Sequence, residues 1–390
     1  MSASDGPIPL LAAKYPDAIG AWVAEMSYDV ARPIHEAVAR ELQAETLGYN
    51  DPVSLELARE SLVRWMKSSY DWSVQPDSIG FVSDIVTGFG AVLNNFLPPR
   101  SHVVVPTPAY APLLDVPAMF GHTVVRVPSL VDGPRQRMDI EGIQRALEDG
   151  ARLVVLCNPH NPTGRVFTVE ELTELADLVE RFSARVFSDE IHAPLTLTTV
   201  PHTPYAKVSA ASAAHTITAT SASKGWNIAG LKCAQLIFSA PQDAARWKHT
   251  AGFFVRSVSR LGVSALRAAY DHPESQLWLD TVRARLARNN ALVAETVAAR
   301  LPEVIHFPAE ATYLAWLDCR ELGLEEPAAF FREHVGLAMT EGTEFSAPGH
   351  LRLNFALPED LLAKALSALV RGAEILRAGR HHERGSTQHA

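Results

Sequence analysis

"RLVVLCNPHNPTGRVFTVEELTELADLVERFSARVFSDEIH", residues 152–192, contains two strand-like runs separated by a helical pattern. The first run, Arg152–Pro159, shows little alternation of apolar and polar residues, as a strand covered on both faces requires. Val169–Phe182 repeats apolar residues at helical spacing, and Arg185–Ser188 is a second β-type run. Strand, helix and strand in this order predict a crossover unit of a parallel sheet.

The same alternation extends over the first two thirds of the chain and predicts an α/β fold. Further strand-like runs lie at His102–Pro106, Thr123–Pro128, Thr216–Thr220 and Ala234–Ser239. After about Pro273 the pattern changes to a long helix, Leu277–Leu301, two short strands, Thr312–Leu317 and His350–Phe355, and a last helix, Glu359–Leu376. We therefore predict a large domain with a mostly parallel sheet between helices, and a smaller α+β domain.

The predicted domain boundaries follow from this change of pattern. Residues 46–275 form the large domain, and residues 15–45 join residues 276–378 in the small domain, because a chain often closes near its start. Residues 379–390 are predicted to be a disordered tail, since they have no apolar residue before Ala390.

Composition excludes several classes of protein. The formal net charge of −9 and the lack of a basic stripe argue against a nucleic-acid partner. The sequence contains no run of 18 apolar residues, so we expect no membrane span. The N-terminus has no basic start and no long apolar segment, so we expect no secretory signal. Three widely spaced cysteines, Cys157, Cys233 and Cys319, are expected to be free thiols in a reducing cytoplasm, with no metal site.

Four chemically distinctive side chains follow strand-like runs: Tyr110, Asn161, Asp189 and Lys224. Because open α/β sheets bind ligands beyond the carboxyl ends of their strands, we expect them to face one crevice. A lysine amine forms a Schiff base with an aldehyde cofactor, and a carboxylate keeps a pyridine nitrogen protonated, so that the ring withdraws electrons. A tyrosine ring stacks on such a ring, and an asparagine amide donates to its phenolic oxygen.

Hydroxyl and cationic groups near Lys224 complete this pattern. Ser221 and Ser223 can hydrogen-bond a phosphate, and Lys232 can supply the counter-charge. Together these residues predict a site for pyridoxal 5′-phosphate (PLP).

The sequence resembles the fold-type I PLP-dependent enzymes of the class I/II aminotransferase family, from about Trp22 to Leu376. Within that family it is most similar to the cystathionine β-lyase (C–S lyase) branch called MalY/PatB. The motifs that carry the resemblance are "WVAEMSY" (22–28), "LGYND" (47–51), "NPHNPTG" (158–164), "SDEIH" (188–192), "SASKGWNIAGLKCA" (221–234) and "RLNFALP" (352–358). The resemblance implies a seven-stranded, mostly parallel sheet and a homodimer with shared active sites.

The resemblance also implies a role for each matched residue. Lys224 would hold the cofactor aldehyde and act as general acid and base, Asp189 would pair with the pyridine nitrogen, and Tyr110 would stack on the ring. Asn161 and His192 would contact the phenolic oxygen, while Ser221 and Lys232 would hold the phosphate. Tyr49 would reach the phosphate in the neighbouring subunit, and Arg352 would bind the substrate α-carboxylate.

Two segments depart from the family pattern. The phosphate turn reads "SDIVTG" (83–88), with Asp84 where a glycine is common, and a carboxylate beside a phosphate is unfavourable unless it points away. The backbone N–H groups of Ile85 and Val86 could still cradle the phosphate. After Arg352 the family's "ACPR" is replaced by "ALPE".

Structural roles compete with several of these assignments. Asp189 could cap a helix, Ser221 and Ser223 could cap backbone groups, His192 could be a packed structural histidine, and Tyr49 could pack within its own subunit.

Three functions remain open at this stage. The first is a C–S β-lyase that cleaves cystathionine, cysteine or a related S-conjugate by α,β-elimination to pyruvate, ammonia and a thiol. The second is an aminotransferase that uses the same residues, and the third is a regulatory protein that has kept the fold without the reaction.

Overall fold

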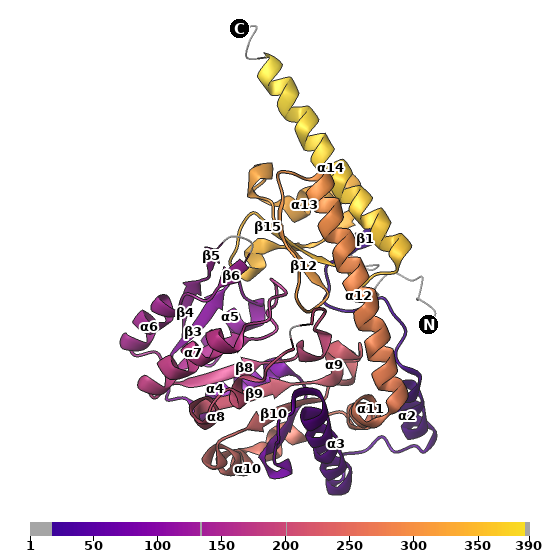
Figure 1. The fold of residues 1–390 in the computed structure, drawn as a ribbon. Helices are drawn as coiled ribbons and strands as arrows, with labels where there is room; N and C mark the ends of the chain where they lie inside the picture. The colour runs from indigo at the N-terminus through magenta and orange to yellow at the C-terminus, as the bar shows by residue number, and fades with distance from the viewer. Residues whose placement is uncertain (1–17, 133–134, 200, 387–390) are drawn as a thin grey trace.

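A seven-stranded sheet forms the centre of the larger of two lobes in the computed structural model, which describes residues 18–132, 135–199 and 201–386 (Figure 1). In spatial order its strands are β2 (Ile79–Val82), β10 (Ala234–Phe238), β9 (Thr216–Thr220), β8 (Arg185–Asp189), β7 (Leu153–Cys157), β3 (His102–Thr107) and β4 (Thr123–Pro128). Strand β10 runs antiparallel to both of its neighbours, β2 and β9, and the other neighbouring pairs of this sheet are parallel. The predicted α/β fold with a mostly parallel sheet is confirmed.

The sheet is buried on both faces, which explains why its strands lack an alternating pattern. In β7, Leu153 and Val155 pack into one apolar cluster, whereas Val154 and Leu156 pack into another on the opposite face. The helices of this lobe are α3 (Pro52–Tyr70), α4 (Ile85–Phe96), α5 (Ala111–Met119), α6 (Ile140–Glu148), α7 (Val169–Arg181), α8 (Ala210–His215), α9 (Ala222–Gly225), α10 (Pro241–Val255) and α11 (Arg260–Asp271). A short hairpin, β5 (Leu130–Asp132) and β6 (Arg135–Arg137), follows β4.

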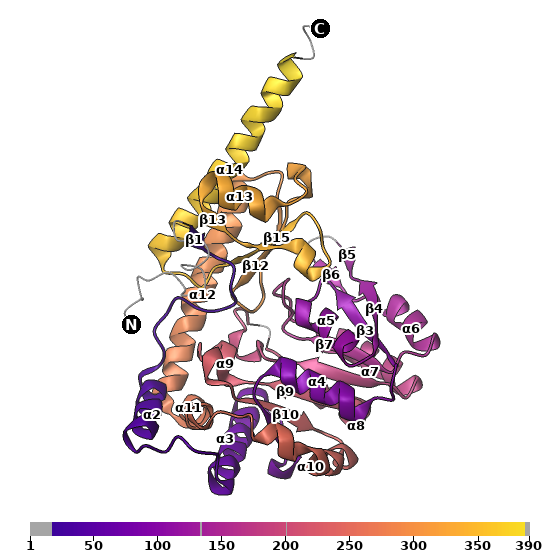
Figure 2. The same cartoon turned by 180° about the vertical axis from the view of Figure 1, so that it is seen from behind.

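The smaller lobe is built on a four-stranded antiparallel sheet. Its spatial order is β11 (Ile305–Phe307), β12 (Leu314–Asp318), β15 (His350–Asn354) and β14 (Thr340–Glu341). The helices α12 (Pro273–Arg300), α13 (Pro327–Val335) and α14 (Glu359–Ser386) belong with this sheet. Figures 1 and 2 show the lobe, coloured orange to yellow, resting against one end of the large sheet.

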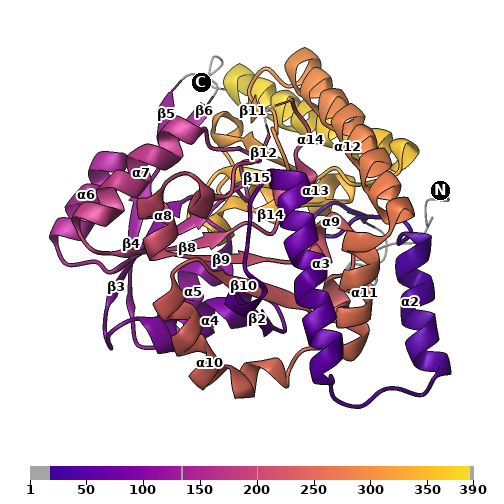
Figure 3. The same cartoon turned by 60° about the horizontal axis from the view of Figure 1, so that its bottom comes forward.

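The N-terminal segment joins both lobes. Strand β1 (Ile19–Gly20) pairs with β13 (Leu337–Ala338) of the small lobe, whereas α2 (Arg32–Gln43) packs beside α11 and α12. Figure 3 shows α2, α11 and α3 side by side. Residues 15–17 lie outside the described residues, so the assignment of 15–45 to the small domain stays a prediction.

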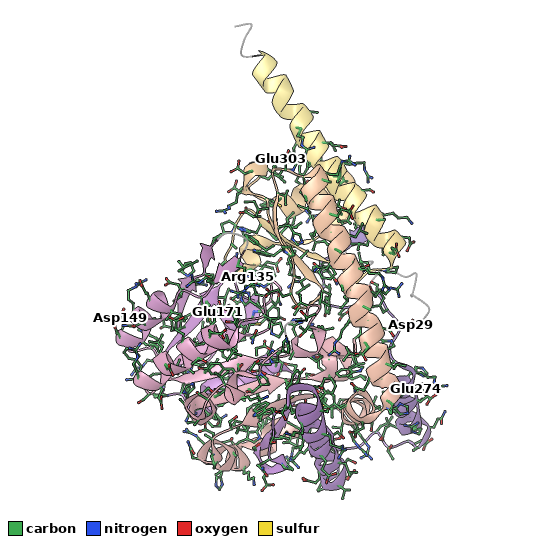
Figure 4. The ribbon with its side chains drawn as sticks, in the orientation of Figure 1. Asp29, Arg135, Asp149, Glu171, Glu274 and Glu303 are labelled. Atoms are coloured by element: carbon green, nitrogen blue, oxygen red, sulfur yellow. The ribbon has the colours of Figure 1, made fainter. Side chains whose placement is uncertain are left out.

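Helix α12 links the two lobes along its length. Glu274 lies at its lower end and forms an ion pair with Arg32 of α2, while Glu303 lies beyond its upper end and pairs with Arg377 of α14 (Figure 4). The helix begins at Pro273, close to the predicted boundary at residue 275.

Helix α14 is longer than the sequence analysis predicts. It continues to Ser386, so residues 379–386 are helical where we expected a disordered tail, and residues 387–390 lie outside the described residues. None of the helices in the described ranges combines the length and apolar character that crossing a bilayer requires.

Candidate active site

A cavity of about 600 Å³ lies where the carboxyl ends of β7, β8 and β9 face the small lobe. This volume is in the range of small-molecule sites. The predicted site residues that line it are Ile85, Val86, Tyr110, Asn161, Asp189, His192, Ser221, Ser223, Lys224, Lys232 and Arg352. The remaining predicted residue, Tyr49, is not part of its lining.

Asp189 is the last residue of β8 and is buried. Its Oδ1 atom accepts a hydrogen bond from the backbone N–H of Ile191, at 3.1 Å. Burial, the largest cause, and the nearby carboxylate of Glu190 raise the pKa of Asp189 to about 7, against the lowering effect of the Ile191 hydrogen bond. A buried carboxyl group of this kind is well suited to pair with a cationic ligand nitrogen.

Lys224 lies in α9, directly after β9, and its side chain enters the same cavity. The Nζ atom donates a hydrogen bond to the backbone oxygen of Ala24, at 2.8 Å, and the hydroxyl of Tyr313 donates to the same oxygen at 2.7 Å. Burial, and then the charge of Arg352, lower the pKa of Lys224 to about 8. Part of the amine is therefore uncharged near neutral pH, as a nucleophile or a base requires.

Arg352 reaches the cavity from β15 of the small lobe and is buried. Its guanidinium donates to Asn161 Oδ1 at 3.1 Å, to the backbone oxygen of Trp22 at 2.8 Å and to Thr340 Oγ1 at 3.1 Å. It lies 4.8 Å from the centre of the Phe345 ring. Its Nε–H is buried and has no hydrogen-bond partner within the described ranges, so one N–H of the guanidinium is not engaged by the protein.

Asn161 and His192 also line the cavity. Asn161 is held by the hydrogen bond from Arg352, which joins the two lobes across the site. Burial, and then the charge of Lys224, lower the pKa of His192 to about 3, so its ring is neutral at physiological pH. Its Nδ1 atom is buried with no partner among the residues that the structure describes, and its ring packs edge-on against Tyr313.

The N-terminus of α4 is a further part of the cavity wall. Ile85 and Val86, at the start of the helix, line it, and free backbone N–H groups at such a terminus favour an anion. Asp84 is the N-cap and accepts from the backbone N–H of Thr87 at 2.8 Å. Its other oxygen lies 3.3 Å from Nζ of Lys232, so the predicted phosphate counter-charge is already paired with an acid.

Ser221 and Ser223 take part in capping the short helix α9. The Ser221 hydroxyl donates to the backbone oxygen of Cys233 at 2.8 Å and accepts from the backbone N–H of Ser223 at 3.1 Å. Ser221 therefore caps backbone groups, which is the structural role that the sequence analysis gives as an alternative. Both serines still line the cavity.

Tyr110 and Tyr49 occupy different environments. Tyr110 is the N-cap residue of α5 and lines the cavity, where burial raises the pKa of its hydroxyl above the ordinary value. The side chain of Tyr49 is 84% exposed, so it does not pack within its own subunit.

Sequence reasoning missed several residues that line the cavity. These are Trp22, Glu25, Ser83, Thr87, Cys157, Thr340 and Glu344, among others. The first two lie within the motif "WVAEMSY", which was used only as a family marker, although Arg352 binds the backbone of this segment directly. Thr340 and Glu344 lie in a stretch with no recognisable motif, so only the fold could reveal them.

Known proteins share this architecture and much of this sequence. The family model "Aminotransferase class I and II" matches residues 22–369. The chain is 33% identical to a cystathionine β-lyase of Corynebacterium glutamicum, over 90% of this chain and 92% of that protein. It is 31% identical to the cystathionine β-lyase PatB of Bacillus subtilis, over 87% and 88% of the two chains.

A solved structure agrees with these matches. The PLP-bound C–S lyase of Staphylococcus hominis superposes with a TM-score of 0.86 and is 27% identical, covering 95% of this chain and 94% of that one.

Proposed function

The chain belongs to the class I and II aminotransferase family, and we propose that it is a PLP-dependent C–S β-lyase. One observation carries the proposal. Lys224, Asp189 and Arg352 come from distant parts of the chain and open into one cavity. A lysine of lowered pKa, a buried acid and an arginine with an unpartnered N–H are the groups that handling an amino acid on a pyridine aldehyde requires.

The residues present fit PLP on structural grounds. The carboxyl group of Asp189 is buried and would face the pyridine nitrogen, and Tyr110 would stack on the ring. Asn161 and the neutral ring of His192 would contact the phenolic oxygen. The first turn of α4, with Ile85 and Val86, would receive the phosphate together with Lys232, Ser221 and Ser223.

When bound, the cofactor withdraws electrons from Cα of the amino acid, so that the Cα–H bond becomes acidic and a sulfur group can leave from Cβ. Arg352, which lines the cavity and has one unpartnered N–H, would bind the substrate carboxylate and so set the orientation of the Cα–H bond. Lys224 accepts the Cα proton at Nζ, which the lowered pKa of this amine favours.

The overall elimination balances with one water molecule: an S-substituted cysteine and water give a thiol, pyruvate and ammonia. Cystathionine, cysteine and related S-conjugates are the substrates that we propose. The choice of lyase over aminotransferase rests on the cystathionine β-lyases of C. glutamicum and B. subtilis, which match almost the whole chain.

The test of this function is the release of pyruvate and a free thiol from L-cystathionine by PLP-loaded protein, with no keto acid added. We expect Lys224→Ala to reduce turnover by at least about a thousandfold, because proton transfer loses its base. Product that forms only when 2-oxoglutarate or pyruvate is supplied as acceptor would show an aminotransferase instead. Full turnover by Lys224→Ala would contradict both enzymatic functions.

We further propose a homodimer in which Tyr49 of each subunit completes the phosphate site of the other. The exposed ring of Tyr49 and the exposed side chains of Leu47 and Val53 in the same segment support this. We also propose a cytoplasmic location, since Cys157, Cys233 and Cys319 are buried free thiols, as a reducing compartment favours.

A further inference from the structure

Asp84 binds the same groups that an anion at the N-terminus of α4 would use. One carboxylate oxygen accepts from the backbone N–H of Thr87 at 2.8 Å. The other lies 3.3 Å from Nζ of Lys232 and accepts from the hydroxyl of Ser83 at 3.3 Å. The carboxylate therefore contacts a backbone donor, a hydroxyl and an ammonium group beside the part of the cavity where the phosphate is proposed to bind.

The negative charge of Asp84 is not needed for its structural role. An N-cap needs only a side-chain oxygen that accepts from the third N–H of the helix, and asparagine caps helices about as well as aspartate. The charge instead acts on whatever lies beside it. A second anion close to this carboxylate meets Coulomb repulsion, and it must also compete for Lys232.

We propose that Asp84 competes with the cofactor's phosphate for the Thr87 N–H and the Lys232 ammonium, and so makes the cofactor weakly held and readily exchanged. The inference rests on the proposed function, which is what places a phosphate at this helix. In the absence of the cofactor, the Asp84 carboxylate would accept from the donors that otherwise bind the phosphate.

The variant Asp84→Asn tests the charge while keeping the cap. We expect the dissociation constant for PLP, measured by titrating apo protein and following the absorbance of the bound cofactor, to fall about tenfold. Pyridoxal, which lacks the phosphate, should bind the variant and the wild type equally. Inorganic phosphate should raise the Tm of apo Asp84→Asn more than that of the wild-type apo protein.

Asp139 offers a matched control. It is the N-cap of α6, where its carboxylate accepts from the backbone N–H of Gly142 at 2.9 Å, and it is not part of the cavity lining. Asp139→Asn removes the same charge from the same kind of position, and it should leave the dissociation constant for PLP unchanged. Asp84→Gly, which removes the carboxylate altogether, should tighten PLP binding in the same direction as Asp84→Asn.

The outcomes distinguish failure of the inference about Asp84 from failure of the proposed function. If wild-type protein binds PLP and Asp84→Asn binds it with equal or weaker affinity, the inference is overturned while the proposed function stands. An equal gain in pyridoxal affinity, or in Asp139→Asn, would also overturn it, since the effect would not depend on the phosphate. Wild-type protein that takes up no PLP at all would overturn the proposed function and this inference together.

Discussion

At the scale of single residues, Asp189 gives the clearest link between burial and function. Its carboxyl group is held by one backbone N–H, that of Ile191, and burial raises its pKa to about 7. Because this pKa lies above the ordinary value near 4, the protonated form favours folding. Its contribution to stability is complete below about pH 4 and is lost as the pH rises from about 4 to about 7.

We therefore predict a pH-dependent difference between apo wild type and Asp189→Asn, whose side chain stays neutral. Below about pH 4 the two free energies of unfolding should be similar, and by pH 7 the wild type should have lost a few kcal/mol relative to the variant, since each pKa unit corresponds to about 1.4 kcal/mol. Urea unfolding at several pH values measures this. His192 stays neutral over this range, because burial lowers its pKa to about 3, and Lys224 titrates above it.

Bound cofactor should reverse the order, because the ionised carboxylate of the wild type would then pair with the pyridine nitrogen. Holo wild type is expected to unfold at a higher Tm than holo Asp189→Asn. A pH-independent difference in the apo proteins would contradict the burial argument.

The sequence identified the residues that carry chemistry more readily than those that hold them in place. Lys224, Asp189 and Asn161 stand out because each follows a strand of an open sheet, where ligand sites form. The carbonyl of Ala24 and the hydroxyl of Tyr313, which together position Lys224, lie 200 and 89 residues away in the chain (224 − 24 and 313 − 224). Neither has a local pattern, because a backbone oxygen and a buried tyrosine are common in any core.

At the scale of elements, the strongly apolar strands were the most predictable part of the fold. The predicted runs at Thr123–Pro128 and Thr216–Thr220 agree with β4 and β9. Strand β2, Ile79–Val82, escaped prediction because it is short and carries Gly80 in its interior, which weakens a strand pattern. The antiparallel direction of β10 was not predicted either, since direction depends on the path of the chain and not on local residues.

Helix α11 makes a close backbone contact with a segment of the candidate site. At Gly262 a Cβ atom would lie 2.2 Å from the backbone oxygen of Leu231 and 2.7 Å from Cβ of Cys233. These two residues flank Lys232, so the helix packs directly against the segment that carries the proposed phosphate counter-charge.

We predict that Gly262→Ala destabilises the protein by about 1–3 kcal/mol and weakens PLP binding, because the segment around Lys232 must move away. Gly252 in α10 is the control, since a Cβ there meets nothing within 4 Å. Gly252→Ala should stabilise the protein by about 0.5–1 kcal/mol, as expected for alanine in a helix interior, and leave PLP affinity unchanged. Thermal unfolding and PLP titration measure both effects, and unaltered stability of Gly262→Ala would contradict the close contact.

At the scale of the whole molecule, the candidate site depends on both lobes. Arg352 of the small lobe binds Asn161 of the large lobe, and the segment from Trp22 to Glu25 runs between them. Asn354 holds this segment through hydrogen bonds to the backbone oxygens of Val23 and Glu25, both at 2.6 Å. Residues that are distant in the sequence thus line the cavity together, so no local sequence pattern predicts its shape.

The proposed role of Tyr49 depends on the assembly of two subunits. Its backbone oxygen accepts from Arg260 at 3.3 Å, so the segment is anchored while the ring extends 84% exposed from the surface. In the proposed dimer, a Lys224→Ala subunit supplies an intact Tyr49, and a Tyr49→Ala subunit supplies an intact Lys224. One of the two sites in a mixed dimer is then complete, whereas each parent dimer has a defect in both sites.

We predict that co-expressing Lys224→Ala with Tyr49→Ala restores about a quarter of the wild-type turnover, since half of the randomly formed dimers are mixed and each has one intact site. Lys224→Ala with Asp189→Asn is the matched control, because both residues belong to the same chain's site and every site in the mixture keeps one defect. That pair should give no activity above the mean of its parents. If the Tyr49 pair also stays at the mean of its parents, Tyr49 does not cross to a neighbouring subunit, and the shared site must be abandoned.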